Sequence, residues 1–299
     1  MNKKSLTMTI VFEAESANYG EGVGNVSSLK KHVRGDGKTY TRISSQALKY
    51  NIIDGMLVEG SRIDNTPMQL AKSVIQFNFD TTIAESAQID LFGCMSTKDS
   101  KIKSRAAVCR VLPAISLEEF QADLDFLTNK AMLDRYNRQN PGSELAGGNI
   151  AQSEIHKSYY SYTVCVDLDR VGVDEDGNEA ISKEEKVNRV KALLYSIKML
   201  QRDIKGRREN LSPLFVIGGV YSTKNPIFLN RVEVKNNNIL VDMIDDARKI
   251  TDEIEEDTIC GCVKSKFAND EEIRNTLGAI SIREFFDKLV ENMEKAFEE

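Results

Sequence analysis

A series of strand-like and helix-like segments in the second half of the chain constrains the fold most strongly. Residues 159–168 are rich in aromatic and β-branched side chains, which predicts a strand. Residues 182–205 begin with the capping-box pattern Ser-Lys-Glu-Glu and continue with apolar residues at helical spacing, which predicts a helix. Residues 213–220 predict a second, buried strand that ends in a glycine pair.

The first half supplies further elements of the same kind. Residues 6–12 predict a strand, a helix begins near residue 44, and residues 105–115 return as a core strand. The whole order predicts an α+β fold with a ferredoxin-like, or RRM-like, core, in which an antiparallel sheet carries two helices on one face. We also expect a helix within residues 117–136 and a hairpin within residues 227–241.

Length and composition bound the architecture and the class of protein. A chain of 299 residues with 41% hydrophobic content can bury a full core, and we expect a single elaborated domain over residues 1–299. No apolar run approaches the ~20 residues that a membrane helix needs. The first residues lead into a strand rather than a secretory signal, so we expect a cytoplasmic protein.

Cysteine and histidine usage argues against metal and nucleophilic chemistry. The five cysteines are scattered, and the one close pair is Cys260 and Cys262. A zinc site would need a second pair or nearby histidines, and the two histidines, His32 and His156, lie outside any nucleophile motif. We therefore expect no cofactor, no metal and no enzymatic activity.

The net charge of −6 is unevenly distributed along the chain. Residues 1–110 carry a balance of +4, and residues from 242 onward carry −9. Two basic clusters account for the surplus, although each is also compatible with a solvated face. The first cluster comprises Lys30, Lys31, His32, Arg34, Lys38, Arg42 and Lys49, and the second comprises Lys98, Lys101, Lys103, Arg105 and Arg110.

The stretch 41–50 carries the most specific functional pattern. On a helix, one stripe would comprise Arg42, Ser45, Gln46 and Lys49, and the packed side would comprise Ile43, Ala47, Leu48, Tyr50 and Ile52. Ser44 or Ser45 would cap a helix start that already favours anions. The pattern predicts a phosphate site, and the alternative is a capped helix with a solvated face.

This stretch, Arg-Ile-Ser-Ser-Gln-Ala-Leu-Lys-Tyr over residues 42–50, resembles the helix of the Cascade backbone subunit, the seventh CRISPR-associated protein family. Tyr50 stands where the family pattern has a basic residue. The segments 90–95, 104–116 and 146–162 resemble further family segments in the same order. The closest branch is the DevR-like type of type I-B complexes.

The resemblance implies a non-catalytic subunit that polymerises head to tail along crRNA and supports recognition of target DNA through the guide, together with other Cascade subunits. It implies a finger-like insertion over residues 54–104, a thumb hairpin over residues 137–158 and an acidic helical part over residues 242–299. The expected RNA-binding residues are Arg42, Ser44, Ser45, Gln46, Lys49, Asn18, Asn25, Lys30, Lys31, Gly147, Gly148, Gly218 and Gly219. A tight turn is an equally good reason for Gly218 and Gly219.

Two other hypotheses remain open at this point. A relative from the type III branch would cut target RNA with a loop aspartate, for which Asp36 is the candidate, although turn aspartates are common. The second alternative is a general single-stranded RNA-binding module that needs no guide.

Overall fold

The computed structural model describes residues 4–15, 18–20, 22, 24–58, 68–71, 73–142, 145–146 and 150–298. Their centre is an antiparallel sheet in the order β19-β16-β1-β13-β10-β4-β3, in which β9 also pairs with β13. The strands are β1 (Ser5–Ala14), β3 (Lys31–Val33), β4 (Thr39–Ile43), β9 (Cys109–Val111), β10 (Ala114–Ser116), β13 (Ser158–Asp167), β16 (Phe215–Tyr221) and β19 (Ile259–Cys262). The predicted strands at residues 6–12, 159–168 and 213–220 are therefore confirmed.

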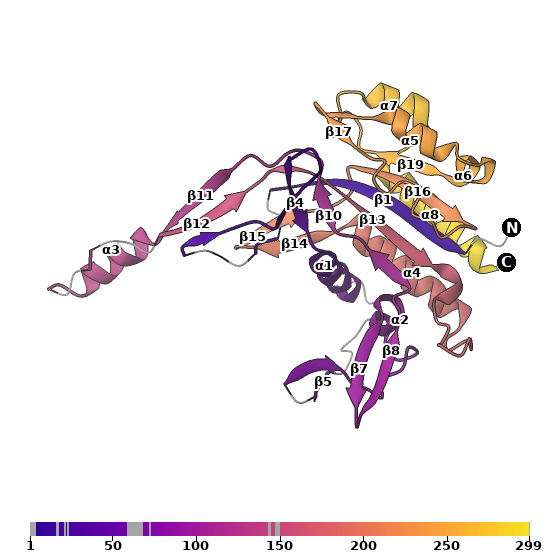
Figure 1. Cartoon of the computed structure of the whole chain (residues 1–299), viewed down its shortest axis with the longest axis horizontal. Helices are drawn as coiled ribbons and strands as arrows, with labels where there is room; N and C mark the ends of the chain where they lie inside the picture. Colours follow the sequence, from indigo (N-terminus) through magenta and orange to yellow (C-terminus); the bar gives the residue numbers. More distant parts are fainter. Residues whose placement is uncertain are drawn as a thin grey trace.

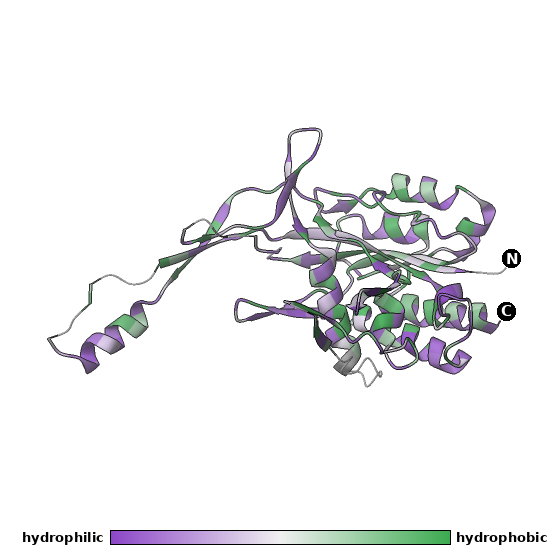
Figure 2. Ribbon diagram, turned by 60° about the horizontal axis from the view of Figure 1, so that its bottom comes forward, coloured by the Kyte–Doolittle hydropathy of each residue, from purple (hydrophilic) through white to green (hydrophobic). Residues whose placement is uncertain are grey.

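One face of the sheet packs on the helices α1 (Ser45–Val58), α4 (Lys183–Lys198) and α8 (Ile282–Glu298) (Figure 1). Alternate residues of β1, from Leu6 to Phe12, point into this core together with Tyr160 and Tyr162 of β13. Figure 2 shows that hydrophobic residues gather where these helices meet the strands, while hydrophilic residues cover the outer helix surfaces. The expected combination of an antiparallel sheet with helices is confirmed at this level.

The opposite face is covered over β19, β16 and β1, where the odd-numbered residues of β1 from Ser5 to Val11 are buried as well. There, α5 (Val241–Arg248), α6 (Asp252–Asp257) and α7 (Asp270–Leu277) lie over β16 and β19 and form a second core with Phe215 and Ile217 (Figure 1). Between β1 and β13 the same face is polar, since Thr9 Oγ1 and Thr163 Oγ1 hydrogen-bond at 2.8 Å. The acidic C-terminal part thus packs on the sheet through its apolar residues.

A long arm, residues 123–155, projects from the body of the molecule (Figure 1). It consists of β11 (Asp123–Thr128), α3 (Lys130–Gln139) and β12 (Ile150–Ile155), and at its base β12 pairs in parallel with β2 (Val26–Ser27). The helix expected within residues 117–136 is found only from Lys130 onward, because residues 123–128 pair with β12 instead. Leu124 and Leu127, which suggested helical spacing, are half exposed on this strand.

Two small hairpins extend from another side of the body, below α1 and α2 (Ala87–Phe92) in Figure 1. They are β5 (Met68–Ala71) with β6 (Val74–Phe77), and β7 (Cys94–Lys98) with β8 (Lys101–Arg105). Asp90 of α2 fixes the β7–β8 hairpin to the body, since its carboxylate accepts from Arg105 of β8 at 2.5 Å and from Arg189 of α4 at 2.9 Å. All three side chains are at most 4% exposed, so this is a fully buried ionic junction.

Three further sequence expectations differ from the observed elements. The helix expected over 182–205 ends at Lys198, because residues 201–210 form the hairpin β14 (Gln201–Ile204) and β15 (Arg207–Asn210) around the turn residues Lys205 and Gly206. The hairpin within 227–241 has strands only at β17 (Val234–Lys235) and β18 (Asn238–Ile239). The strand expected over 105–115 is divided into the end of β8, β9 and β10.

A single-turn 3-10 helix spans Leu168–Arg170 directly after β13. Among the described residues, no helix combines the length and the apolar character required to cross a lipid bilayer.

Candidate nucleic-acid interface

Three neighbouring segments of the chain, around residues 18, 30 and 42–44, meet at the start of α1, and we call this meeting point the α1 junction. The Lys30 amide donates to the Asn18 carbonyl at 2.6 Å, and the Arg42 amide donates to the Lys30 carbonyl at 2.9 Å. The Asn18 side-chain oxygen accepts from the Ser44 amide at 2.9 Å. The fold therefore brings four of the predicted site residues, Asn18, Lys30, Arg42 and Ser44, into one place.

Ser44 is the N-cap of α1. Its hydroxyl accepts from the Ala47 amide at 3.3 Å, and its carbonyl accepts from the Leu48 amide at 3.1 Å. The amides of Ser45 and Gln46 occupy the first turn, where an α-helix has no acceptor of its own. The helix dipole adds positive potential at this end, so the first turn favours an anion.

Arg42 lies on strand β4 and not on the helix, so the predicted four-residue helical stripe is wrong in this one member. The helix begins at Ser45, and Ser45, Gln46 and Lys49 are exposed or half-exposed in its first five residues. Arg42 is nevertheless exposed beside the helix start. Tyr50 was expected on the packed side, but it is 71% exposed, while Leu48 and Ile52 are fully buried as expected.

The β3–β4 hairpin presents one further cation, Arg34, beside Tyr40, which lies two residues before Arg42 on β4 and so on the same face. His32 and Tyr40 are paired across the hairpin, and the Arg34 guanidinium lies 4.1 Å from the centre of the Tyr40 ring. Burial lowers the pKa of His32, and the positive charges of Arg34 and Arg42 lower it further. His32 is therefore held in its neutral form near pH 7.

Lys31 and Asn25 lie at the base of the arm. The Lys31 ammonium is bound by the Glu154 carboxylate of β12 at 2.7 Å and lies 4.6 Å above the Phe120 ring. The Asn25 carbonyl accepts from the Gln152 amide at 2.9 Å. Both residues therefore take part in attaching the arm to the body.

Most of the second basic cluster is engaged within the protein. Arg105 is buried against Asp90, and Lys103 donates to the carbonyls of Phe79 and Thr81. Lys98 pairs with Asp80 and Arg110 pairs with Asp167. These contacts leave the first cluster as the better candidate for binding an external anion.

Gly218 and Gly219 lie inside strand β16 and are fully buried. A Cβ atom at Gly218 would approach the Thr7 carbonyl oxygen to 2.1 Å, and one at Gly219 would approach that of Asp257 to 2.2 Å. Close packing of the backbone explains both glycines. Gly147 and Gly148 lie outside the described residues.

The remaining candidates for chemistry have structural contacts. The Asp36 carboxylate accepts from the Lys38 amide at 3.0 Å and closes its own turn. Cys260 and Cys262 are buried in β19, where burial raises the pKa of both thiols. Within the described ranges, no group of three or more His, Cys, Asp or Glu side chains has a metal-binding arrangement.

Sequence reasoning missed the basic hairpin β14–β15, which was taken for the end of a helix. Lys205 at its turn donates to Ser153 Oγ of the arm at 2.5 Å and lies 4.0 Å from the centre of the Tyr19 ring. The available sequence signal for a turn was Gly206, and in the structure both Lys205 and Gly206 have positive φ, as this kind of hairpin turn requires.

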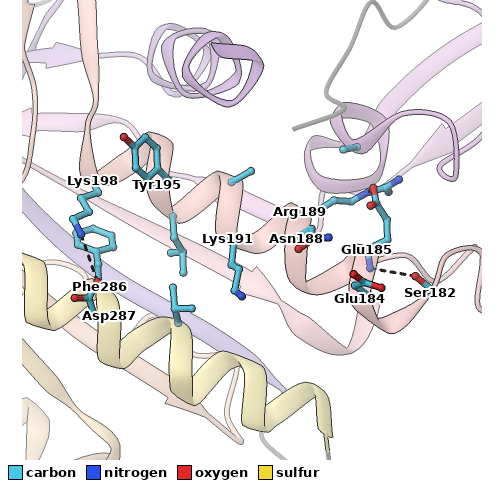
Figure 3. Close-up of a pocket in the computed structure, with 14 residues that line it drawn as sticks. Ser182, Glu184, Glu185, Asn188, Arg189, Lys191, Tyr195, Lys198, Phe286 and Asp287 are labelled. Atoms are coloured by element: carbon cyan, nitrogen blue, oxygen red, sulfur yellow. Dashed lines mark hydrogen bonds and ion pairs between the residues drawn. The ribbon is translucent and has the colours of Figure 1, made fainter. Parts of the chain in front are cut away.

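A pocket of about 670 Å³ lies away from the α1 junction, along α4 and α8 (Figure 3). Its ends are marked by the Ser182 cap, which accepts from the Glu185 amide, and by the Lys198–Asp287 pair at 3.6 Å. Its lining mixes acidic, basic and apolar side chains, so it does not continue the cationic surface around Arg42.

This fold has counterparts among known structures of RNA-guided complexes. One similar chain, from a structure titled "CRISPR RNA-guided surveillance complex", superposes with a TM-score of 0.62 at 17% identity, over 96% of this chain and 98% of that chain. Another, titled "CRISPR RNA-guided surveillance complex, pre-nicking", has a TM-score of 0.62 at 13% identity, over 96% and 99% of the two chains. At these identities the similarity establishes a shared fold. No curated protein matches the sequence.

The family follows from the sequence itself. The pattern of the family described as "CRISPR-associated negative auto-regulator DevR/Csa2" matches residues 6–241. The chain belongs to this CRISPR-associated family, and the resemblance drawn from residues 42–50 is confirmed at the level of the family.

Proposed function

We propose that this protein is a non-catalytic backbone subunit of a type I CRISPR (Cascade) effector complex, and that it polymerises along the spacer of crRNA. Family membership gives the CRISPR context. The observation that carries the RNA-binding role is the α1 junction, where Asn18, Lys30, Arg42 and Ser44 converge on a capped helix start.

Phosphate binding at this junction follows from its chemistry. The amides of the first turn of α1 and the hydroxyl of Ser45 donate hydrogen bonds, while Arg42 and Lys49 add full positive charges. Gln46 is exposed in the same turn and supplies a further donor. Such contacts read the backbone and not the bases, so recognition of target DNA would come from pairing with the guide.

The topology supports an RRM-like core. In chain order, β1, α1, β9–β10, β13, α4 and β16 alternate as in a ferredoxin-like fold, and the strands lie side by side as β16, β1, β13 and β9–β10. In this proposal residues 54–104 are the fingers, and residues 242–299 form an acidic part that contacts protein rather than RNA. The thumb, expected over residues 137–158, is the arm, which begins earlier, at β11.

The arm favours assembly with other chains. Helix α3 has no buried residue, and Met132 and Tyr136 on it are exposed, as are Leu124 and Phe126 on β11. An exposed arm of this kind gains stability when it packs on a partner. We propose that the arm binds the next copy of this chain, in a head-to-tail arrangement, and other Cascade subunits. Five free cysteines suit a cytoplasmic location.

A nuclease-protection experiment tests the proposal. The full chain is expressed, purified at moderate salt and digested lightly with nuclease, and the co-purified RNA is sized and sequenced. Polymerisation along a guide predicts a ladder of protected fragments with a constant increment. A general single-stranded RNA-binding module would give unordered fragments, which would contradict the backbone role.

The type III alternative is tested in the same preparation. Divalent metal and a target RNA complementary to the bound guide are added, and the length of the target is followed with time. We expect intact target, because the Asp36 carboxylate closes its own turn. Cleavage that disappears in Asp36→Ala would replace the type I proposal with the type III one.

A further inference from the structure

A buried histidine lies at the point where the chain returns from the arm to the body. His156 directly follows β12, and it is 9% exposed. The Thr41 hydroxyl of β4 lies 2.8 Å from His156 Nδ1 and 2.8 Å from the Tyr160 hydroxyl of β13. We call His156, Thr41 and Tyr160 the His156 cluster. It joins the end of the arm to the strand that carries Arg42, because Thr41 and Arg42 are consecutive in β4.

The ring of His156 makes polar contacts that a neutral imidazole satisfies. One ring nitrogen of a neutral imidazole donates and the other accepts, so the ring can pair with the Thr41 hydroxyl and with the Glu119 backbone at the same time. The Tyr160 hydroxyl also donates to the His156 carbonyl at 3.2 Å. The rings of Phe120 and Tyr160 meet the imidazole edge to face, with centres 5.4 and 6.4 Å away. Both the ring and the backbone of His156 are therefore held in place.

No carboxylate is placed to neutralise a positive charge on His156. Among the described residues His156 forms no ion pair, because the charged groups on the surrounding segments pair with one another. These pairs are Glu15 with Arg207, Lys38 with Glu119, Lys31 with Glu154, Lys157 with Glu13, and Arg202 with Glu209. Burial lowers the pKa of His156, while a hydrogen bond to the Glu119 backbone and the Glu118 carboxylate act in the opposite direction without offsetting it. The site therefore favours the neutral ring.

We propose that His156 is a positioning residue for the arm, which fixes the arm on β4 while its ring is neutral and releases this contact when the ring takes up a proton. The stabilisation is complete above the usual histidine pKa of 6.5 and is lost as the pH falls toward the lowered pKa of the fixed ring. Because one proton is involved, the ratio of fixed to released arm should fall at most about tenfold per pH unit.

Release of this contact should widen the range of arm positions without detaching the arm. Two other contacts at the base of the arm remain, namely the ion pair of Lys31 with Glu154 and the hydrogen bond from Lys205 to Ser153. The arm would then no longer be held in a fixed position relative to β4 and its Arg42.

Electron paramagnetic resonance measures the position of the arm in the free protein. Nitroxide labels are attached through Met132→Cys on α3 and Lys288→Cys on α8, in a Cys94→Ser background, because Cys94 is the one native cysteine that is not buried. We expect a narrow distribution of distances at about pH 7.5 and a broader one at about pH 5. His156→Asn keeps a hydrogen-bonding group for Thr41 and cannot take up a proton, so its distribution should be narrow at both pH values. His156→Ala removes the contact, so its distribution should be broad at both.

His32→Asn is the matched control, because the chain has two histidines and His32 lies on β3, outside the His156 cluster. This variant should respond to pH as the parent protein does, and a lost response would assign the titration to His32 and overturn the proposal. The proposal is also wrong if the parent distribution is the same at both pH values, or if the response survives in His156→Asn. Thermal unfolding shows whether each variant is folded, and if His156→Ala does not fold, the parent and His156→Asn decide. The measurement requires no RNA, so its result is independent of the proposed function.

Discussion

Removal of two cations at the α1 junction should weaken RNA binding in a salt-dependent manner. Arg42 and Lys49 are contributed by β4 and α1, and neither makes an ion pair with another described residue. Each would neutralise one phosphate, and on a single strand each such contact contributes about 0.7 to the slope of log K against log salt. The double variant Arg42→Ala/Lys49→Ala should therefore lower this slope by about 1.4.

The same arithmetic gives the change in affinity. At 0.1 M salt the double variant should bind RNA about 25-fold more weakly than the parent protein. This difference in affinity should be about sevenfold smaller at 200 mM salt than at 50 mM salt. The free energy of unfolding should change by less than about 0.5 kcal/mol, because exposed cations contribute little to stability.

Fluorescence anisotropy with a labelled single-stranded RNA, repeated over a salt series, measures both quantities. The matched control is Arg283→Ala/Lys288→Ala on α8, which removes the same charge from an exposed surface separated from α1 by α4. If the control lowers the slope as much as the double variant does, or if the double variant binds like the parent, the reasoning that places phosphates at the α1 junction is refuted.

Three further predictions concern stability and are read by chemical or thermal unfolding. Asp90→Ala removes the one fully buried carboxylate shared by Arg105 and Arg189 and leaves them only the more exposed Glu175 and Glu185, so it should cost about 3 kcal/mol, whereas a loss below 1 kcal/mol would mean that the buried junction contributes little. Ser44→Ala removes the cap of α1 and should cost about 1 kcal/mol, and an unchanged midpoint would contradict the capping role. The pKa of Glu13 is lowered chiefly by its hydrogen bond to Lys266, so the stabilising charge is lost as the pH falls through the lowered folded value. Glu13→Gln should therefore flatten the decrease in stability below about pH 4, and an unchanged acid profile would exclude this pair as a contributor.

The sequence predicted the core elements because their patterns are local. β1, β13 and β16 are continuous β-branched or aromatic runs, and α4 begins at the capping serine that the motif indicated. The polar residues of the first turn of α1 were likewise readable, because capping depends on neighbours within three positions.

The sequence could not place what depends on distant partners. Arg42 has the right spacing for a helix, but its strand pairing with β10 decides its conformation. Asp123 to Thr128 follow a helical spacing and become a strand because β12 lies beside them. The junction of Asn18 with Lys30, Arg42 and Ser44 consists of backbone hydrogen bonds and one bond from the Ser44 amide to the Asn18 side chain. These bonds join separate segments, which no local pattern encodes.

The measurement that tests the central claim most directly is protection of individual lysines from acetylation, followed by mass spectrometry with and without bound RNA. Lys30 and Lys49 lie at the proposed phosphate site, and Lys288 on α8 is an internal reference. The account predicts that RNA protects Lys30 and Lys49 and leaves Lys288 unchanged. Equal reactivity of Lys30 and Lys49 in the free and RNA-bound protein would contradict the placement of the guide at the start of α1.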